Sequence, residues 1–157
     1  MAGRRASGSA AGIQTGVASA YLLDTGFLVA LADQRDPDHA ECRAAWSRAR
    51  GKFVTVEGVL VEAAHLVRRN RGGFETVFGI VRSVGTELVP PSQDRYQRAI
   101  NLMRKYRDVP MDLVDALLVA VAEERGVESV LTLDQRGFRT YRLHGRRRFS
   151  ILPAHRR

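Results

Sequence analysis

The sequence YLLDTGFLVAL, residues 21–31, decides the expected fold of the chain. Its first three residues are apolar and end at Asp24, which is the pattern of a short buried strand. The residues from 27 to 32 stay apolar without alternating, so we expect a short helix there. This stretch therefore predicts a strand that ends in an acidic side chain and leads directly into a helix.

The alternation of strand and helix continues to the end of the chain. Short apolar runs predict further strands at 53–54, 87–89, 129–133 and 149–152. Segments with helical character lie between them, at 37–50, 56–69 and 74–84, then from Ser92 to the break at 108–110, and at 113–125. Strands separated by helices indicate βαβ units, and strands that are apolar throughout indicate helices on both faces. We therefore expect an α/β fold with a central parallel sheet.

Individual residues are expected to begin, end or orient these helices. Asp36 is expected to cap one helix, with Pro37 in its first turn, and Thr55 and Ser92 to cap two others. Gly126 is expected to end the helix 113–125. The side chains expected to point inward on the helix after Ser92 are Tyr96, Ile100 and Met103. Those expected to share one face of the helix 56–69 are Val56, Val59, Leu60, Ala63, Leu66 and Val67.

The composition fits one ordinary globular domain. The chain has 157 residues, of which 45% are hydrophobic. Its single cysteine, Cys42, excludes an intramolecular disulfide, which fits a reducing compartment. No apolar run is long enough to span a membrane. The pair Arg4-Arg5 is followed by small and polar residues, not by the apolar core of an export signal. We expect a cytoplasmic protein with a disordered tail at 1–19 and a single domain at 20–157.

The chain is strongly basic. Its formal net charge is +8, and only two of its 25 basic residues are lysines. Arginine suits phosphate recognition because its planar fork matches phosphate oxygens in pairs. A genome that favours arginine codons would give the same bias. The sign of the charge still indicates a polyanionic partner.

Five acidic residues stand where a solvated surface acid is not expected. Asp24 and Asp134 each follow a predicted strand, so both lie at the edge of the sheet where ligands bind. Glu62 lies at the border of an apolar helix face, and Asp112 and Asp115 open a strongly apolar helix. Each has a simpler interpretation, as a loop residue, a boundary glutamate or a capping pair.

A cluster of these carboxylates would need a cation. Neighbouring carboxylates raise one another's pKa values unless a positive charge lies among them. Hard divalent ions such as Mg²⁺ and Mn²⁺ take oxygen ligands and can activate water for attack on a phosphoryl group. An acidic site in a basic protein therefore indicates cleavage of a phosphodiester, with the basic surface binding the backbone.

Four segments together resemble the motifs of PIN domains. They are DTGFLVAL at 24–31, VEAAHL at 61–66, PMDLVDAL at 110–117 and TLDQRGF at 132–138. The resemblance spans about residues 20–153. It implies a three-layer α/β/α fold with a central parallel sheet and a Mg²⁺- or Mn²⁺-dependent endoribonuclease. It places the family's acidic residues on Asp24, Glu62, Asp115 and Asp134, with Asp112 as an auxiliary acid. Thr25 and Thr132 match hydroxyl positions near the metal.

Within the PIN domains, the sequence is most similar to the VapC-type toxins of bacterial toxin–antitoxin pairs. This resemblance implies an RNA substrate, a small antitoxin that covers the site, and a homodimer. The arginines that follow or flank the acidic motifs are the candidates for binding RNA phosphates. They are Arg68, Arg69, Arg71, Arg136 and Arg139.

Other classes of protein share parts of this pattern. Asp24-Thr25-Gly26 is also the tripeptide of retroviral-type aspartic proteases, but that fold is nearly all β. A phosphatase with an aspartyl-phosphate intermediate needs a second aspartate at position 26, which is glycine. A housekeeping RNA-processing nuclease and a PIN-like module that binds without cutting remain the alternatives. The four histidines, His39, His65, His144 and His155, have no metal-binding spacing.

Overall fold

The computed structural model describes residues 19–154, which form a five-stranded parallel sheet flanked by helices. The strand order is β3-β2-β1-β4-β5, and every pair is parallel. The strands are β1 (Ala20–Leu23), β2 (Lys52–Val56), β3 (Glu87–Val89), β4 (Ser129–Leu131) and β5 (Ser150–Leu152). The predicted parallel sheet is confirmed. The predicted tail falls outside the described residues except for Ser19, whose carbonyl accepts from the Lys52 backbone N–H.

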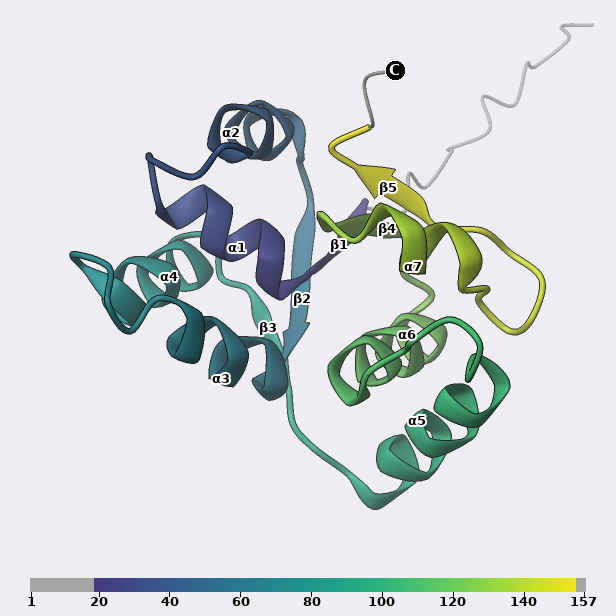
Figure 1. The fold of residues 1–157 in the computed structure, drawn as a ribbon. Helices are drawn as coiled ribbons and strands as arrows, with labels where there is room; N and C mark the ends of the chain where they lie inside the picture. Colours follow the sequence, from purple (N-terminus) through teal and green to yellow (C-terminus); the bar gives the residue numbers. More distant parts are fainter. Residues whose placement is uncertain (1–18, 155–157) are drawn as a thin grey trace, which may run out of the picture.

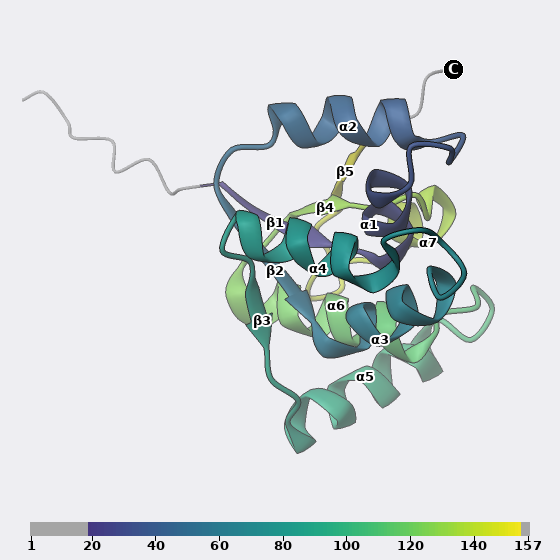
Figure 2. The same ribbon diagram turned by 90° about the vertical axis from the view of Figure 1, so that its left-hand side faces the viewer.

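Helices cover both faces of the sheet, so the expected three-layer architecture is confirmed. Figure 1 shows α1 to α4 on one side and α5 to α7 on the other. Figure 2 shows α3 and α4 side by side on their face. The helices are α1 (Thr25–Ala32), α2 (His39–Arg48), α3 (Glu57–Leu66), α4 (Gly73–Ser83), α5 (Gln93–Lys105), α6 (Leu113–Arg125) and α7 (Gln135–Thr140). No helix within residues 19–154 is long and apolar enough to cross a membrane.

The course of the chain places a natural binding edge between β1 and β4. From β1 the chain moves outward through β2 to β3, and then returns to add β4 on the other side of β1. Leu23 and Leu131, the last residues of β1 and β4, are paired in register. The residues after them therefore emerge side by side, at the point where the strand order reverses. Ligands of open parallel sheets bind at such points.

Helix α6 shows how the sequence builds the core. All seven residues from Ala116 to Ala122 are buried, because the helix lies between the sheet and α5. The carboxylate of Asp112 caps its N-terminus by accepting from the Asp115 backbone N–H. Gly126 ends it with a left-handed φ of 65°, as expected for a helix C-terminus. Ser92 caps α5 as predicted.

Two capping predictions were wrong. Helix α2 begins at His39, not near Pro37, because Asp36 instead forms a turn in which its side chain accepts from the Asp38 N–H. Thr55 caps no helix, because β2 continues through Val56. The Thr55 hydroxyl is fully buried and donates to the Leu23 carbonyl of the neighbouring strand.

The buried faces of two helices also differ from the prediction. Tyr96 and Ile100 of α5 are 42% and 40% exposed, whereas Ala99 and Leu102 are buried. The small side chain of Ala99 lets α5 lie close to α6. Arg95 and Arg98 of α5 also form ion pairs with α6, to Glu124 and Glu123 respectively, and these pairs favour turning this face of α5 toward α6. Helix α3 ends at Leu66, which is 54% exposed.

The segment after β4 differs most from the prediction. Strand β4 ends at Leu131, two residues earlier than expected, and α7 was not predicted. Asp134 is thus not the end of the strand but the cap of α7, where its carboxylate accepts from the Gly137 N–H.

Candidate functional site

Asp24 and Thr132 form the centre of the site, at the ends of the two neighbouring strands. The Thr132 hydroxyl donates to Asp24 Oδ2 at 2.6 Å and accepts from the Asp134 backbone N–H at 2.9 Å. Asp24 Oδ1 accepts from the Thr25 backbone N–H at 2.7 Å. Asp24 and Thr132 are both buried. One hydroxyl therefore links the acid after β1 to the segment after β4.

Glu62 is brought to this centre from α3. The Thr25 hydroxyl, at the start of α1, donates to Glu62 Oε2 at 2.8 Å. Glu62 is half-buried, whereas its neighbours Val61 and His65 face solvent. The hydroxyls of Thr25 and Thr132, which the resemblance places near the metal, each donate to a carboxylate.

Asp115 approaches from α6, on the opposite face of the sheet. Its Oδ2 accepts from the Tyr141 hydroxyl at 3.1 Å. Asp112, one turn earlier, is exposed and is engaged in capping α6. Asp112 and Asp115 could be recognised from their place before an apolar helix, whereas no sequence pattern indicated Tyr141.

The electrostatics show that these acids are close enough to influence one another. Burial raises the pKa of Asp24 to about 6, although hydrogen bonds from Thr132 and from the Thr25 backbone lower it. The charges of Asp134 and Glu62 raise it further. A group whose ionised form is disfavoured by burial and by like charges gains from a nearby cation.

Asp115 is perturbed more strongly. Burial is the largest cause that raises its pKa to about 8, followed by the charge of Asp112. The charges of Asp24 and Asp134 raise it as well, against the hydrogen bond from Tyr141. Acids from three separate elements thus share one electrostatic environment.

The donor set fits a hard divalent cation. Within residues 19–154, no ion pair joins any of the five acids to a basic side chain. Their hydrogen-bond donors are hydroxyls and backbone N–H groups. In the same part of the chain, no three acidic, histidine or cysteine side chains are placed to hold one metal ion as they stand. The chemistry of the set still suits Mg²⁺ or Mn²⁺, because these ions take oxygen ligands and ionised carboxylates keep lone pairs beside their protein donors.

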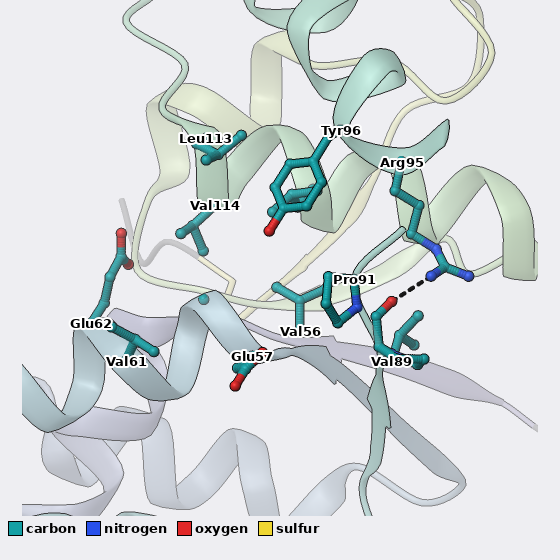
Figure 3. A pocket seen from close by; sticks show the side chains of 13 residues that line it. Val56, Glu57, Val61, Glu62, Val89, Pro91, Arg95, Tyr96, Leu113 and Val114 are labelled. Carbon is teal, nitrogen blue, oxygen red and sulfur yellow. Dashed lines mark hydrogen bonds between the residues drawn. The ribbon is translucent and has the colours of Figure 1, made fainter. Parts of the chain in front are cut away.

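An apolar groove adjoins the acids. It encloses about 260 Å³ between α3, the β3–α5 connection and the start of α6, and Glu62 lines it. Figure 3 shows Tyr96 pointing into this groove from α5, with Leu113 and Val114 on one side and Pro91 on the other. Val61, Tyr96 and Leu113 are each more than 40% exposed along it. The groove is thus a solvent-facing apolar surface with an acidic margin.

The five candidate arginines fall into two groups. Arg136 and Arg139 are exposed on α7, which begins directly after Asp134. Those after α3 are Arg68, Arg69 and Arg71, and all three are exposed. Asn70, within that group, donates to Asp33 at the far end of α1. Since α1 has eight residues, that end lies about 12 Å from Thr25. In sequence, the α7 arginines follow a site acid more closely than the group after α3 does.

A PIN-domain family model matches residues 21–143, and the chain belongs to this family. Ribonuclease VapC26 of Mycobacterium tuberculosis is 28% identical over 135 residues, which are 84% of this chain and 99% of that protein. The chain is thus a distant homologue of VapC toxins, as the motifs predicted.

Solved structures of similar proteins confirm the fold. The Mycobacterium tuberculosis VapC20 structure, described as a sarcin-ricin loop cleaving toxin, has a TM-score of 0.68 at 21% identity, covering 74% of this chain and 91% of that chain. A toxin–antitoxin complex from Klebsiella pneumoniae has a TM-score of 0.58 at 19% identity, covering 76% and 91%. DNA-bound VapBC from Salmonella typhimurium has a TM-score of 0.57 at 16% identity, covering 85% and 98%.

Proposed function

We propose that this PIN-domain protein is a Mg²⁺- or Mn²⁺-dependent endoribonuclease and the toxin of a type II toxin–antitoxin pair. The observation that carries the proposal is the group of mutually perturbed carboxylates at the edge between β1 and β4, which no basic side chain of residues 19–154 neutralises. The relation to a protein named as a ribonuclease supports it.

Asp24 and Asp115 would be the primary metal ligands, with Asp134 beside them. Glu62 would bind directly or through water, and Asp112 would be an auxiliary acid. When bound, the metal supplies a nucleophilic water and charge stabilisation at the phosphate. Thr132 orients Asp24, and Thr25 orients Glu62. An ionised carboxylate has about four lone-pair sites, so each of these acids can accept from its present donor and still bind an ion.

The basic surface would bind the RNA backbone. Arg136 and Arg139 follow Asp134 on α7, and neither forms an ion pair with an acid of residues 19–154. Exposed arginines beside an acidic site can bind phosphates on both sides of the bond to be cut.

The groove beside Glu62 would receive a segment of the antitoxin. Its apolar walls suit an apolar side chain, and Glu57 and Glu62 at its margin suit a neighbouring basic residue. Structural neighbours of this chain include toxin–antitoxin complexes. We also propose that the toxin forms a homodimer, which light scattering of the purified chain would test.

The first experiment measures RNA cleavage by the purified chain with Mg²⁺, with Mn²⁺ and with EDTA. Cleavage that requires metal and is nearly abolished by Asp24→Asn is the expected result. Asp94→Asn, an exposed acid of α5, is the matched control and should cut normally. RNA binding without metal-dependent cleavage would favour the non-catalytic alternative.

The second experiment adds the product of the neighbouring upstream reading frame. Inhibition near one-to-one stoichiometry, relieved by Val61→Glu in the groove, is expected, because a buried charge opposes an apolar contact. Val61→Glu alone should leave cleavage unchanged. Full activity beside a saturating neighbour, or no growth defect on expression alone, would favour a housekeeping RNA-processing nuclease.

A further inference from the structure

Asp115 depends on another element for its orientation. In α6, the backbone N–H of Asp115 donates to the carboxylate of Asp112, which caps the helix. The side chain of Asp115 extends from this first turn. Its carboxylate accepts from the hydroxyl of Tyr141, which lies 26 residues further along the chain. Tyr141 immediately follows α7, the helix that Asp134 begins.

Tyr141 is held rigidly by its surroundings. It is fully buried, and its backbone N–H donates to the Gly137 carbonyl. Its ring packs edge-on against Tyr106, with centroids 5.2 Å apart, and against Phe138 at 5.4 Å. Such edge-to-face pairs restrict the ring in addition to burying it. The hydroxyl is therefore presented to Asp115 from a fixed position.

Gly137 brings Tyr141 and Asp134 to the same place. A Cβ atom at Gly137 would lie 2.1 Å from Asp134 Oδ2 and 2.9 Å from the Tyr141 hydroxyl. The backbone N–H of Gly137 also donates to Asp134 Oδ1. The absence of a side chain at this position thus leaves room for both groups. The segment of α7 therefore positions Asp134 directly and Asp115 through Tyr141.

We propose that Tyr141 is a positioning residue, whose hydroxyl fixes the Asp115 carboxylate in the orientation needed to bind the metal ion. The inference rests on the proposed metal-dependent function. Removing a side chain that hydrogen-bonds to a metal ligand typically lowers metal affinity about 10- to 100-fold. Tyr141 is not one of the proposed metal ligands, and it acts through Asp115.

The test is Tyr141→Phe, which removes only the hydroxyl, with Mn²⁺ affinity measured by calorimetry. The control is Tyr106→Phe, because Tyr106 is a buried neighbour whose hydroxyl accepts from the Arg142 N–H and contacts no carboxylate. Tyr141→Phe should weaken Mn²⁺ binding at least about 10-fold, and Tyr106→Phe should not. Equal Mn²⁺ affinity in wild type and Tyr141→Phe would overturn the inference.

A second measurement needs no metal. Urea unfolding of Tyr141→Phe, Asp115→Asn and the double variant, all in EDTA, forms a double-mutant cycle. Non-additive shifts of the unfolding midpoint are expected, and additive shifts would overturn the inference. A wild type that binds no Mn²⁺ would overturn the proposed function, and the inference with it. If both tyrosine variants lose Mn²⁺ affinity equally, the role of Tyr141 is packing and the inference is wrong.

Discussion

Burial is the main cause that raises the pKa values of two site acids, Asp24 and Asp115. Their pKa values are raised to about 6 and about 8, whereas an ordinary aspartate titrates near 3.9. The folded protein therefore holds protons on these groups at pH values where the unfolded chain has lost them. Stability that is present below about pH 4 is then lost as the pH rises through the folded pKa values.

We therefore predict that the metal-free protein is less stable at pH 8.5 than at pH 5. The loss should be roughly 2 kcal/mol once solvent screening is allowed for. Asp115→Asn should remove most of it, because its amide does not ionise. The measurement is urea unfolding in EDTA at both pH values, with the exposed Asp108→Asn as the control. Equal pH dependence in wild type and Asp115→Asn would contradict the assignment.

Thr132 is the second residue with a distinct prediction. Valine has nearly the same shape, but it cannot donate to Asp24 or accept from the Asp134 N–H. Thr132→Val should lower the free energy of unfolding by about 1–3 kcal/mol and weaken Mn²⁺ binding about 10-fold. Thr55→Val is the matched control, because Thr55 is equally buried in β2 of the same sheet and its hydroxyl bonds only a carbonyl. If both variants keep full Mn²⁺ affinity, Thr132 does not position Asp24.

At the scale of the element, the start of α6 combines two roles that one substitution separates. Asp112 caps the helix, and it also raises the pKa of Asp115. Asp112→Ser keeps an oxygen for the cap and removes the charge, whereas Asp112→Ala removes both. Asp112→Ala should cost about 1 kcal/mol of stability and Asp112→Ser much less. If Asp112 is an auxiliary metal ligand, both variants should lose cleavage; if it is only a cap, Asp112→Ser should cut RNA normally.

The presence of acids at the β1–β4 edge could be predicted from the sequence, whereas α7 could not. Apolar runs mark the strands, and the carboxyl ends of parallel strands share one edge, so Asp24 and Asp134 were expected there. Helix α7 has six residues with two arginines, a glycine and one large buried side chain, Phe138. That pattern has no helical periodicity, and the helix depends on the Asp134 cap and on packing. The contact of Tyr141 with Asp115 joins distant segments, so no local pattern indicates it.

At the scale of the whole molecule, the net charge of the chain and the charge of its site have opposite signs. The chain carries a formal charge of +8, while its site gathers acids that no basic side chain of residues 19–154 neutralises. A polyanion would therefore be attracted to the surface and repelled by the site unless a cation lies there. This difference in sign makes metal and RNA binding interdependent, and RNA should bind more tightly with Mg²⁺ than with EDTA.

The arginines of α7 provide the last prediction. In the Asp24→Asn background, which should bind RNA without cutting it, the logarithm of affinity should fall linearly with the logarithm of salt concentration. Removing Arg136 and Arg139 together should reduce that slope by about 2, since each lost phosphate contact lowers it by about 1. Replacing Arg43 and Arg48 instead, two exposed arginines of α2, changes the net charge equally and should leave the slope almost unchanged. Fluorescence anisotropy of a labelled RNA at several salt concentrations measures all three slopes. If the two pairs of arginine substitutions change the slope equally, RNA binding responds to net charge alone. The proposed contact of RNA phosphates with Arg136 and Arg139 would then be wrong.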